Sequence, residues 1–203
     1  MDISKYKLNP SLHITQKNSD FIISWGKSKA KQATSNDLLA IKILAEELSI
    51  ETLQHDYALK PLMVNYVLRK AAEQGFITAP TSKIIRDTSI FNKNLEVDDE
   101  FTTAHAFTIQ WHITNACDLH CKHCYDRTNR AQTSLQEGIK TLDDLVNFCN
   151  EKNVRGHVCF SGGNPFMSPI FYDLYQAASD RGFSTSILGN PVTKKQLQQV
   201  IDI

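Results

Sequence analysis

The sequence contains no long apolar run and no excess of charge of either sign. Its 203 residues include 22 basic and 22 acidic side chains, so the formal net charge is zero at neutral pH. No stretch approaches the ~18 apolar residues that a membrane-spanning helix needs. A balanced charge also gives little means of neutralising nucleic-acid phosphates or an anionic membrane surface. We therefore expect neither a nucleic acid nor a membrane as partner.

Cysteine is scarce, and three of the five cysteines fall within one short stretch. An odd number of cysteines in a chain of this length argues against a disulfide framework. The beginning, MDISKYKLNPSLHITQ, has no apolar run behind a basic segment, as a secretory signal would have. We therefore expect a cytoplasmic protein with reduced thiols, in which clustered cysteines bind metal or take part in chemistry.

Residues 1–86 have the pattern of an α+β, winged-helix-like domain. The stretches SLHIT and FIISW alternate as strands do, and three helical patterns follow them. The third helix is expected to begin at Pro61 and to end at Gly75, because these residue types favour the two ends of a helix. FIT and KIIR flank the turn-like APTS and predict a small β wing. The polar stretch 87–106 predicts a linker to a second domain.

Residues 107–203 alternate between strand and helix patterns. FTIQWHI, HVCFS and TSIL predict strands, and helices are expected over 141–150, over 169–181 and from a cap at Thr193 to Ile203. This order implies parallel strands with right-handed crossovers. The pattern therefore predicts an α/β segment that comprises the first three βα units of a partial TIM-type barrel.

Two unusual motifs follow the first two of these strands. Cys117, Cys121 and Cys124 have the spacing C-x3-C-x2-C within CDLHCKHCY, and GGNP follows HVCFS. Because active sites in α/β folds form at the carboxyl ends of strands, we expect both motifs on the same rim. An iron–sulfur cluster normally takes four thiolates, so three from one loop would leave one iron open.

Other roles compete for the polar residues of this segment. The cysteines could instead hold zinc with one nearby histidine, namely His112, His120 or His123. Cys149 and Cys159 fall on apolar faces and are expected to be small core residues. Trp111 alternates with His112 along its strand, so one of the two is expected to face the barrel interior. Asn190 ends the third strand, where a turn or cap role competes with cofactor contact.

The cysteine spacing resembles the signature of radical S-adenosylmethionine (SAM) enzymes. The resemblance implies that the methionine moiety of SAM chelates the open iron of a 4Fe-4S cluster and that SAM is cleaved to a 5′-deoxyadenosyl radical. His123 and Tyr125 would lie against the adenine. Gly162, Gly163 and Asn164 stand where the family carries its GGE motif and would hold the ammonium of SAM. An amide at 164 can still accept from an ammonium, but without the charge of the usual glutamate.

The two halves together resemble a radical SAM peptide maturase with an N-terminal PqqD-like peptide-recognition element. GGNPF and LGNP resemble the thio(seleno)oxazole-associated subgroup. The resemblance implies that the first domain binds the leader of a ribosomally made precursor peptide by adding it as a strand to a sheet edge. A second copy or a partner chain is expected to complete the barrel, and this chain alone is expected to have little or no turnover. No residue is assigned a catalytic role.

Two other functions compete with the enzyme. One is a leader-peptide binding module whose partial barrel is inactive. The other is a zinc-stabilised regulator that binds DNA through the third helix of the first domain. That helix carries Arg69 and Lys70, but Glu73 opposes them and the domain is neutral, which makes DNA the weaker partner. The identity of the bound metal separates the regulator from the other two.

Overall fold

The computed structural model describes residues 2–90, 92, 96–124 and 132–203. The chain divides into two compact units, Met1–Thr81 and Ser82–Ile203. The first unit therefore ends at Thr81, earlier than the boundary expected at residue 86. Within the described ranges, no helix combines the length and the apolar character that a membrane span requires.

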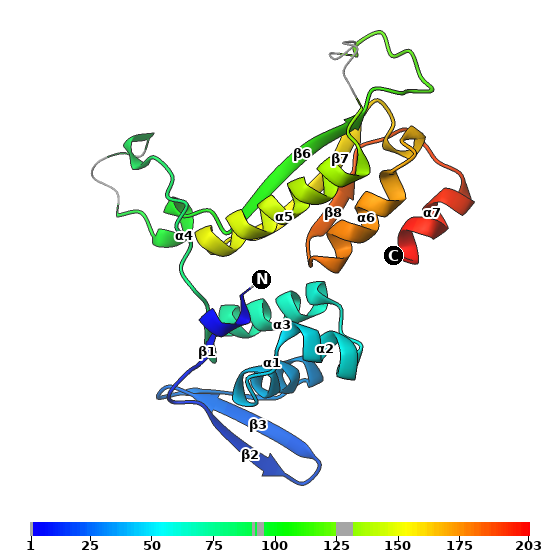
Figure 1. Ribbon diagram of the computed structural model, residues 1–203. Coiled ribbons are helices and arrows are strands. Elements are labelled where there is room, and N and C mark those ends of the chain that lie inside the picture. The colour runs from blue at the N-terminus through cyan, green and yellow to red at the C-terminus, as the bar shows by residue number, and fades with distance from the viewer. Residues whose placement is uncertain (1, 91, 93–95, 125–131) are drawn as a thin grey trace. The chain divides into compact units, whose positions relative to one another are not determined.

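Unit 1 consists of a three-stranded antiparallel sheet, three α-helices and a short two-stranded pairing (Figure 1). The sheet has the order β2-β3-β4, and β1 pairs with β5. The elements are η1 (Ile3–Lys5), β1 (Lys7–Leu8), β2 (His13–Lys17), β3 (Asp20–Trp25), β4 (Lys29–Gln32), α1 (Ser35–Ala45), α2 (Ile50–Tyr57), α3 (Pro61–Gln74) and β5 (Ile77–Thr78).

The ends of the helices in unit 1 follow from local side-chain chemistry. Thr34 caps α1 in a reciprocal capping box with Asp37, and Ser49 caps α2. Pro61 begins α3 and Gly75 ends it with φ +89°, which confirms both predicted bounds. A residue with a Cβ would be strained at that φ, so glycine suits this end of the helix.

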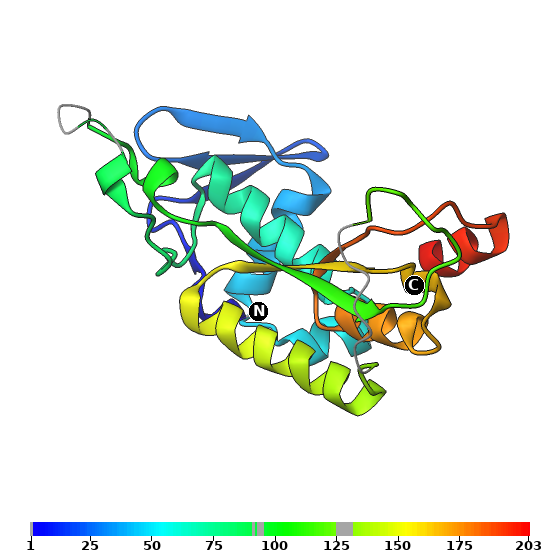
Figure 2. The ribbon, with the colours of Figure 1, turned by 90° about the horizontal axis from the view of Figure 1, so that it is seen from above.

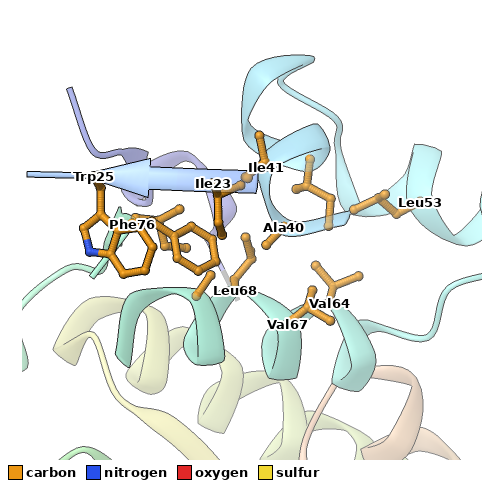
Figure 3. Close-up of a cluster of buried hydrophobic side chains, with 12 residues drawn as sticks. Ile23, Trp25, Ala40, Ile41, Leu53, Val64, Val67, Leu68 and Phe76 are labelled. Atoms are coloured by element: carbon orange, nitrogen blue, oxygen red, sulfur yellow. The ribbon is translucent and has the colours of Figure 1, made fainter. Parts of the chain in front are cut away.

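One apolar core holds unit 1 together. In Figure 3, Ile23 and Trp25 of β3 face Val64, Val67 and Leu68 of α3. The Trp25 ring also meets Phe76 edge-on, with the ring centroids 5.5 Å apart. Ile23, Val64 and Leu68 are fully buried, so the sheet and the helices depend on each other for burial of their apolar faces.

The expected β wing does not form. Among the described strand pairings, β5 of the FIT stretch pairs with β1, while Ile85 of the KIIR stretch bridges to Thr103. The Arg86 N–H donates to the Thr102 carbonyl at 2.7 Å, and the Ala104 N–H donates to Ile84 at 2.9 Å. Residues 82–86 and part of the segment expected as a linker therefore pair with each other within unit 2. Residues 84–86 pair with residues 102–104, which are far from them in the sequence, and alternation within either segment could not predict this pairing.

Unit 2 is built on a three-stranded parallel sheet with the order β6-β7-β8. Parallel pairing and the strand–helix alternation were both predicted, and the structure confirms them. The elements are η2 (Thr88–Ile90), α4 (Asp99–Thr102), β6 (Ala106–Thr114), α5 (Leu135–Lys152), β7 (Arg155–Gly162), η3 (Pro165–Met167), α6 (Phe171–Asp180), β8 (Ser184–Ile187) and α7 (Lys194–Ile201).

Helices α5 and α6 cover one face of this sheet (Figures 1 and 2). Trp111 of β6 and Phe160 of β7 lie in the apolar cluster on that face, with their ring centroids 6.1 Å apart. Trp111 is therefore the packing member of the Trp111–His112 pair, and alternation places His112 on the opposite face. Cys149 belongs to the same cluster, as expected. Cys159 is also buried, at 8% exposure, as expected of a small core residue, but it lies outside the apolar cluster that the helices cover.

The face opposite the helices carries polar side chains. His157 of β7 bridges two serines of β8, with Nδ1 2.9 Å from Ser184 Oγ and Nε2 2.9 Å from Ser186 Oγ. The Ser184 hydroxyl also lies 3.4 Å from the Gly156 carbonyl, to which it can donate. That donation leaves the Ser184 oxygen to accept from Nδ1–H and leaves Nε2 to accept from Ser186. The sheet thus has one apolar face under helices and one hydrogen-bonding face.

A prediction concerns Asp37, which is 4% exposed and lies 2.7 Å from Lys31 Nζ. Burial acts to raise the pKa of Asp37, but hydrogen bonds from Lys31 and Thr34 outweigh it and hold the pKa below its ordinary value. Asp37→Asn should lower the free energy of unfolding of unit 1 by about 1–2 kcal/mol at neutral pH, because the ion pair with Lys31 and the charge that strengthens the hydrogen bonds from Thr34 are lost.

The same pKa shift determines the pH dependence of that difference. The stabilisation is complete above the unfolded pKa of about 3.9 and is lost as the pH falls through the lower folded pKa. Urea unfolding of the two full-length proteins between about pH 7 and pH 2 should show their difference shrinking only below about pH 4. A difference that is constant over this range would contradict the proposed role of the Asp37 charge.

Candidate metal centre

The carboxyl ends of β6, β7 and β8 bring the predicted motifs to one rim of the sheet (Figure 1). The cysteine loop leaves the end of β6, the glycine pair closes β7, and Asn190 follows β8 in the sequence. Hydrogen bonds join all three segments, as described below. The rim expected from the strand order is therefore present among the described residues.

The three cysteines of the loop differ in exposure. Cys117 and Cys121 are half-buried and Cys124 is exposed. The Cys124 N–H donates to the Cys121 carbonyl at 3.1 Å, which forms a turn between the second and third cysteines. Cys117 Sγ lies 3.5 Å from the Leu119 N–H donor and 3.4 Å from Asn190 Nδ2. Hydrogen bonds to the ligating sulfurs are among the features that tune iron–sulfur clusters.

The glycine pair lets the end of β7 approach the beginning of the cysteine loop. The Gly163 N–H donates to the Thr114 carbonyl at 2.8 Å, and the Asn164 N–H donates to the Ala116 carbonyl at 2.7 Å. A Cβ on Gly162 would lie 2.1 Å from the Thr114 oxygen, and one on Gly163 would lie 2.3 Å from the Ala116 oxygen. These contacts are with backbone atoms, which cannot move aside as a flexible side chain can. The pair therefore positions the residues that lead to Cys117.

Asp118 is a site residue that sequence reasoning missed. Its Oδ1 accepts hydrogen bonds from Asn164 Nδ2, at 3.0 Å, and from Asn190 Nδ2. The hydrogen bond from Asn190 first, and then those from Asn164 and from the Asp118 N–H, hold the pKa of Asp118 below its ordinary value. Two amide side chains at the ends of neighbouring strands could have signalled a shared acceptor on the cysteine loop.

Asn164 is engaged on both sides of its amide. The residue is 4% exposed; its Nδ2 donates to Asp118, and its Oδ1 accepts from the Phe166 N–H at 3.3 Å. In this arrangement the Asn164 side chain links β7 to the cysteine loop and caps η3. A direct contact between Asn164 and a cofactor ammonium stays a prediction.

His123 and Tyr125 are the remaining predicted site residues. His123 is exposed and immediately precedes Cys124. Tyr125 lies outside the described residues. Cys149 lies in the apolar cluster of unit 2. Burial there raises the pKa of its thiol to about 11, so the thiol stays protonated at neutral pH. Burial in the α5 core thus separates this cysteine from the three on the rim.

The donor set of the loop suits an iron–sulfur cluster. Within the described parts of the chain, no group of three or more His, Cys, Asp or Glu residues is arranged to hold a single metal ion. A four-iron cluster spaces its thiolates farther apart than a single ion does. Three cysteines on one loop, with amide donors near Cys117, supply soft ligands and hydrogen bonds of the kind that such clusters use.

Residues 108–201 match the model of a 4Fe-4S single cluster domain. The matched residues contain the three cysteines, the glycine pair and Asn190. A 4Fe-4S cluster is thus the cofactor of this segment, which we call the cluster domain. Cys117, Cys121 and Cys124 are the residues that would hold the cluster.

One curated protein matches part of the chain. Fe-coproporphyrin III synthase of Methanosarcina barkeri (strain Fusaro / DSM 804) is 30% identical over 86 residues, which are 40% of this chain and 20% of that protein. The chain thus spans about a fifth of the length of this relative.

Solved structures of SuiB from Streptococcus suis are similar at a lower level. SuiB bound to the precursor peptide SuiA has a TM-score of 0.38 and 10% identity, with 96% of this chain and 45% of SuiB covered. SuiB bound to S-adenosylmethionine has a TM-score of 0.36 and 10% identity, with 95% and 44% covered. TM-scores at this level do not establish a shared fold.

A prediction follows from the close approach at Gly163. Gly163→Ala should lower the free energy of unfolding by about 1–3 kcal/mol, because the added methyl group meets the Ala116 carbonyl. Iron bound after anaerobic reconstitution should fall as well, since the residues leading to Cys117 must move. Iron analysis and thermal unfolding measure the two effects.

Gly26→Ala is the control, because a Cβ at Gly26 meets no atom within 4 Å although the φ is +63°. This variant should lose some stability through backbone strain and keep its iron. Full iron loading in Gly163→Ala would show that the approach of β7 does not position the loop.

Proposed function

We propose that the cluster domain is that of a radical SAM enzyme and that this enzyme modifies a ribosomally synthesised peptide. The observation that carries the proposal is the placement of three cysteines, spaced C-x3-C-x2-C, after the end of β6 within a segment that matches a 4Fe-4S domain. The second cofactor in this proposal is SAM. When bound, the cluster would supply the electron that cleaves SAM and yields a 5′-deoxyadenosyl radical.

Three ligands from one loop are the reason to propose an open iron. Cys117, Cys121 and Cys124 would occupy three irons, and the described residues of the loop offer no fourth cysteine. The exposure of Cys124 keeps this side of the loop accessible to a second cofactor. An amino acid chelate such as the methionine end of SAM can fill the remaining position.

The proposed SAM contacts come from this loop and from the end of β7. His123 and Tyr125 would border the adenine, and the backbone at Gly162 and Gly163 would approach the methionine end. Asn164 is the proposed ammonium contact, although its amide already serves Asp118 and Phe166. The amide oxygen has a second lone pair, so it can accept from an ammonium without giving up Phe166.

The peptide part of the proposal rests on unit 1. Its sheet has two edge strands, β2 and β4, each of which pairs only with β3 among the described residues. The Ala33 N–H donates to the Phe21 carbonyl on β3. Because donors alternate along an antiparallel strand, the N–H groups of Ala30 and Gln32 face the free edge of β4. An extended leader peptide could pair with these groups as an added strand.

The first prediction tests the metal and its ligands. Anaerobic reconstitution should load about four irons and four sulfides per chain, and replacing Cys117, Cys121 and Cys124 with alanine should abolish loading. Cys149→Ala is the matched control and should keep the cluster, because Cys149 is buried among apolar side chains. One tightly bound zinc and no iron would overturn the radical SAM enzyme proposal and favour a zinc-stabilised regulator.

The cofactor part of the proposal needs its own measurement. The reconstituted chain should bind SAM and change the electron paramagnetic resonance (EPR) spectrum of its reduced cluster, since a ligand on the open iron alters that iron's surroundings. If the EPR spectrum of the reduced cluster does not change when SAM is added, the radical SAM part of the proposal is wrong, and the chain is a 4Fe-4S protein of another kind. Formation of 5′-deoxyadenosine under reducing conditions is the accompanying activity assay.

A separate prediction concerns peptide binding at β4. A peptide selected from a displayed random library against the full chain should bind about tenfold more weakly to Ala30→Pro, because proline removes one outward N–H. Fluorescence anisotropy gives the dissociation constants. Gln16→Pro is the control on β2, the opposite edge strand. The Lys17–Asp20 pair closes a two-residue hairpin, so the N–H of the preceding residue, Gln16, points away from β3. Equal binding by the unsubstituted chain and Ala30→Pro would rule out strand addition at β4.

A further inference from the structure

Asn190 lies where a single amide can reach two groups of the cysteine loop. Its Nδ2 is 3.4 Å from Cys117 Sγ and is hydrogen-bonded to Asp118 Oδ1. An amide nitrogen carries two hydrogens, so one can point to the sulfur and the other to the carboxylate. Asn190 comes just after β8, so this contact joins the third strand to the loop that follows the first.

The carboxylate of Asp118 is held by donors from two different strands. Asn164 follows β7 and Asn190 follows β8, and both donate to the same oxygen. Asp118 immediately follows Cys117, so its orientation and that of the first cysteine are coupled through one peptide unit. The two amides thereby restrain the part of the loop that carries the Cys117 sulfur.

A donor at a ligating sulfur also has an electronic effect. Adding an electron to a 4Fe-4S cluster increases the negative charge on its thiolates, and an N–H donor stabilises that charge more in the reduced state than in the oxidised state. Removing such a donor makes the cluster harder to reduce. Cys117 has two such donors in the structure, the backbone N–H of Leu119 and the amide of Asn190.

We propose that Asn190 is a positioning residue that sets the reduction potential of the cluster by bridging Cys117 and Asp118. This inference rests on the proposed function, since it requires the cluster on Cys117. A purely structural role in the turn between β8 and α7 would be the alternative. The two roles differ in one measurable quantity, because a turn residue has no reason to change the potential of the cluster.

Asn190→Ala tests this role in the full reconstituted chain. In an EPR-monitored redox titration, the equilibrium constant for reduction of the cluster should fall by roughly tenfold. The reduction potential should then be about 59 mV lower, since the couple transfers one electron. Asn147→Ala is the matched control: Asn147 is exposed on α5, so its removal should leave the potential unchanged. Asn190→Leu removes the same donor at nearly constant size and decides the question if the alanine variant does not fold.

The outcomes separate this inference from the proposed function. A cluster with an unchanged potential in Asn190→Ala and Asn190→Leu, whatever the melting temperature, would overturn the role of Asn190 and leave the enzyme proposal standing. Absence of any cluster in the unsubstituted chain would overturn both. A lowered potential in the Asn190 variants, with the Asn147→Ala control unchanged, is the result that we expect.

Discussion

The close approach of the β7 backbone to the residues after β6 is the constraint on which the rest of the candidate site depends. Thr114 and Ala116 accept hydrogen bonds from the N–H groups of Gly163 and Asn164. No side chain larger than hydrogen fits between these strands at Gly162 and Gly163. The direction in which the cysteine loop leaves the sheet is therefore set by backbone contacts, before any metal is bound.

At the polar rim, two side-chain amides donate hydrogen bonds to one carboxylate. Asn164 and Asn190 donate to Asp118, and the same donors lower the pKa of its carboxyl group, so the charge persists beside Cys117. The helix-covered face of the same sheet is apolar, with Trp111 and Phe160 packed under α5 and α6. One sheet thus separates the packing that stabilises unit 2 from the hydrogen bonds that shape its loop.

Unit 1 has its own buried apolar core and one buried carboxylate. Asp37 completes the capping box of α1 and pairs with Lys31 of β4, so a charge-assisted contact connects the helix to the edge strand. Lys31 also donates to Gln74 at the end of α3. These contacts hold β4 against the helices while its outward N–H groups at Ala30 and Gln32 stay available for pairing.

The sequence by itself determined the strand–helix alternation of unit 2, its parallel pairing and the identity of the three rim cysteines, because periodicity and motif spacing are local properties. It also determined the ends of α3, where Pro61 and Gly75 act through their own backbone preferences. Only the tertiary structure decided that KIIR pairs with Thr103 instead of forming a wing, and that Cys159 lies away from the helix-covered core. It alone joined Asp118 to Asn164 and Asn190, because hydrogen bonds between residues far apart in sequence leave no periodic trace in either segment.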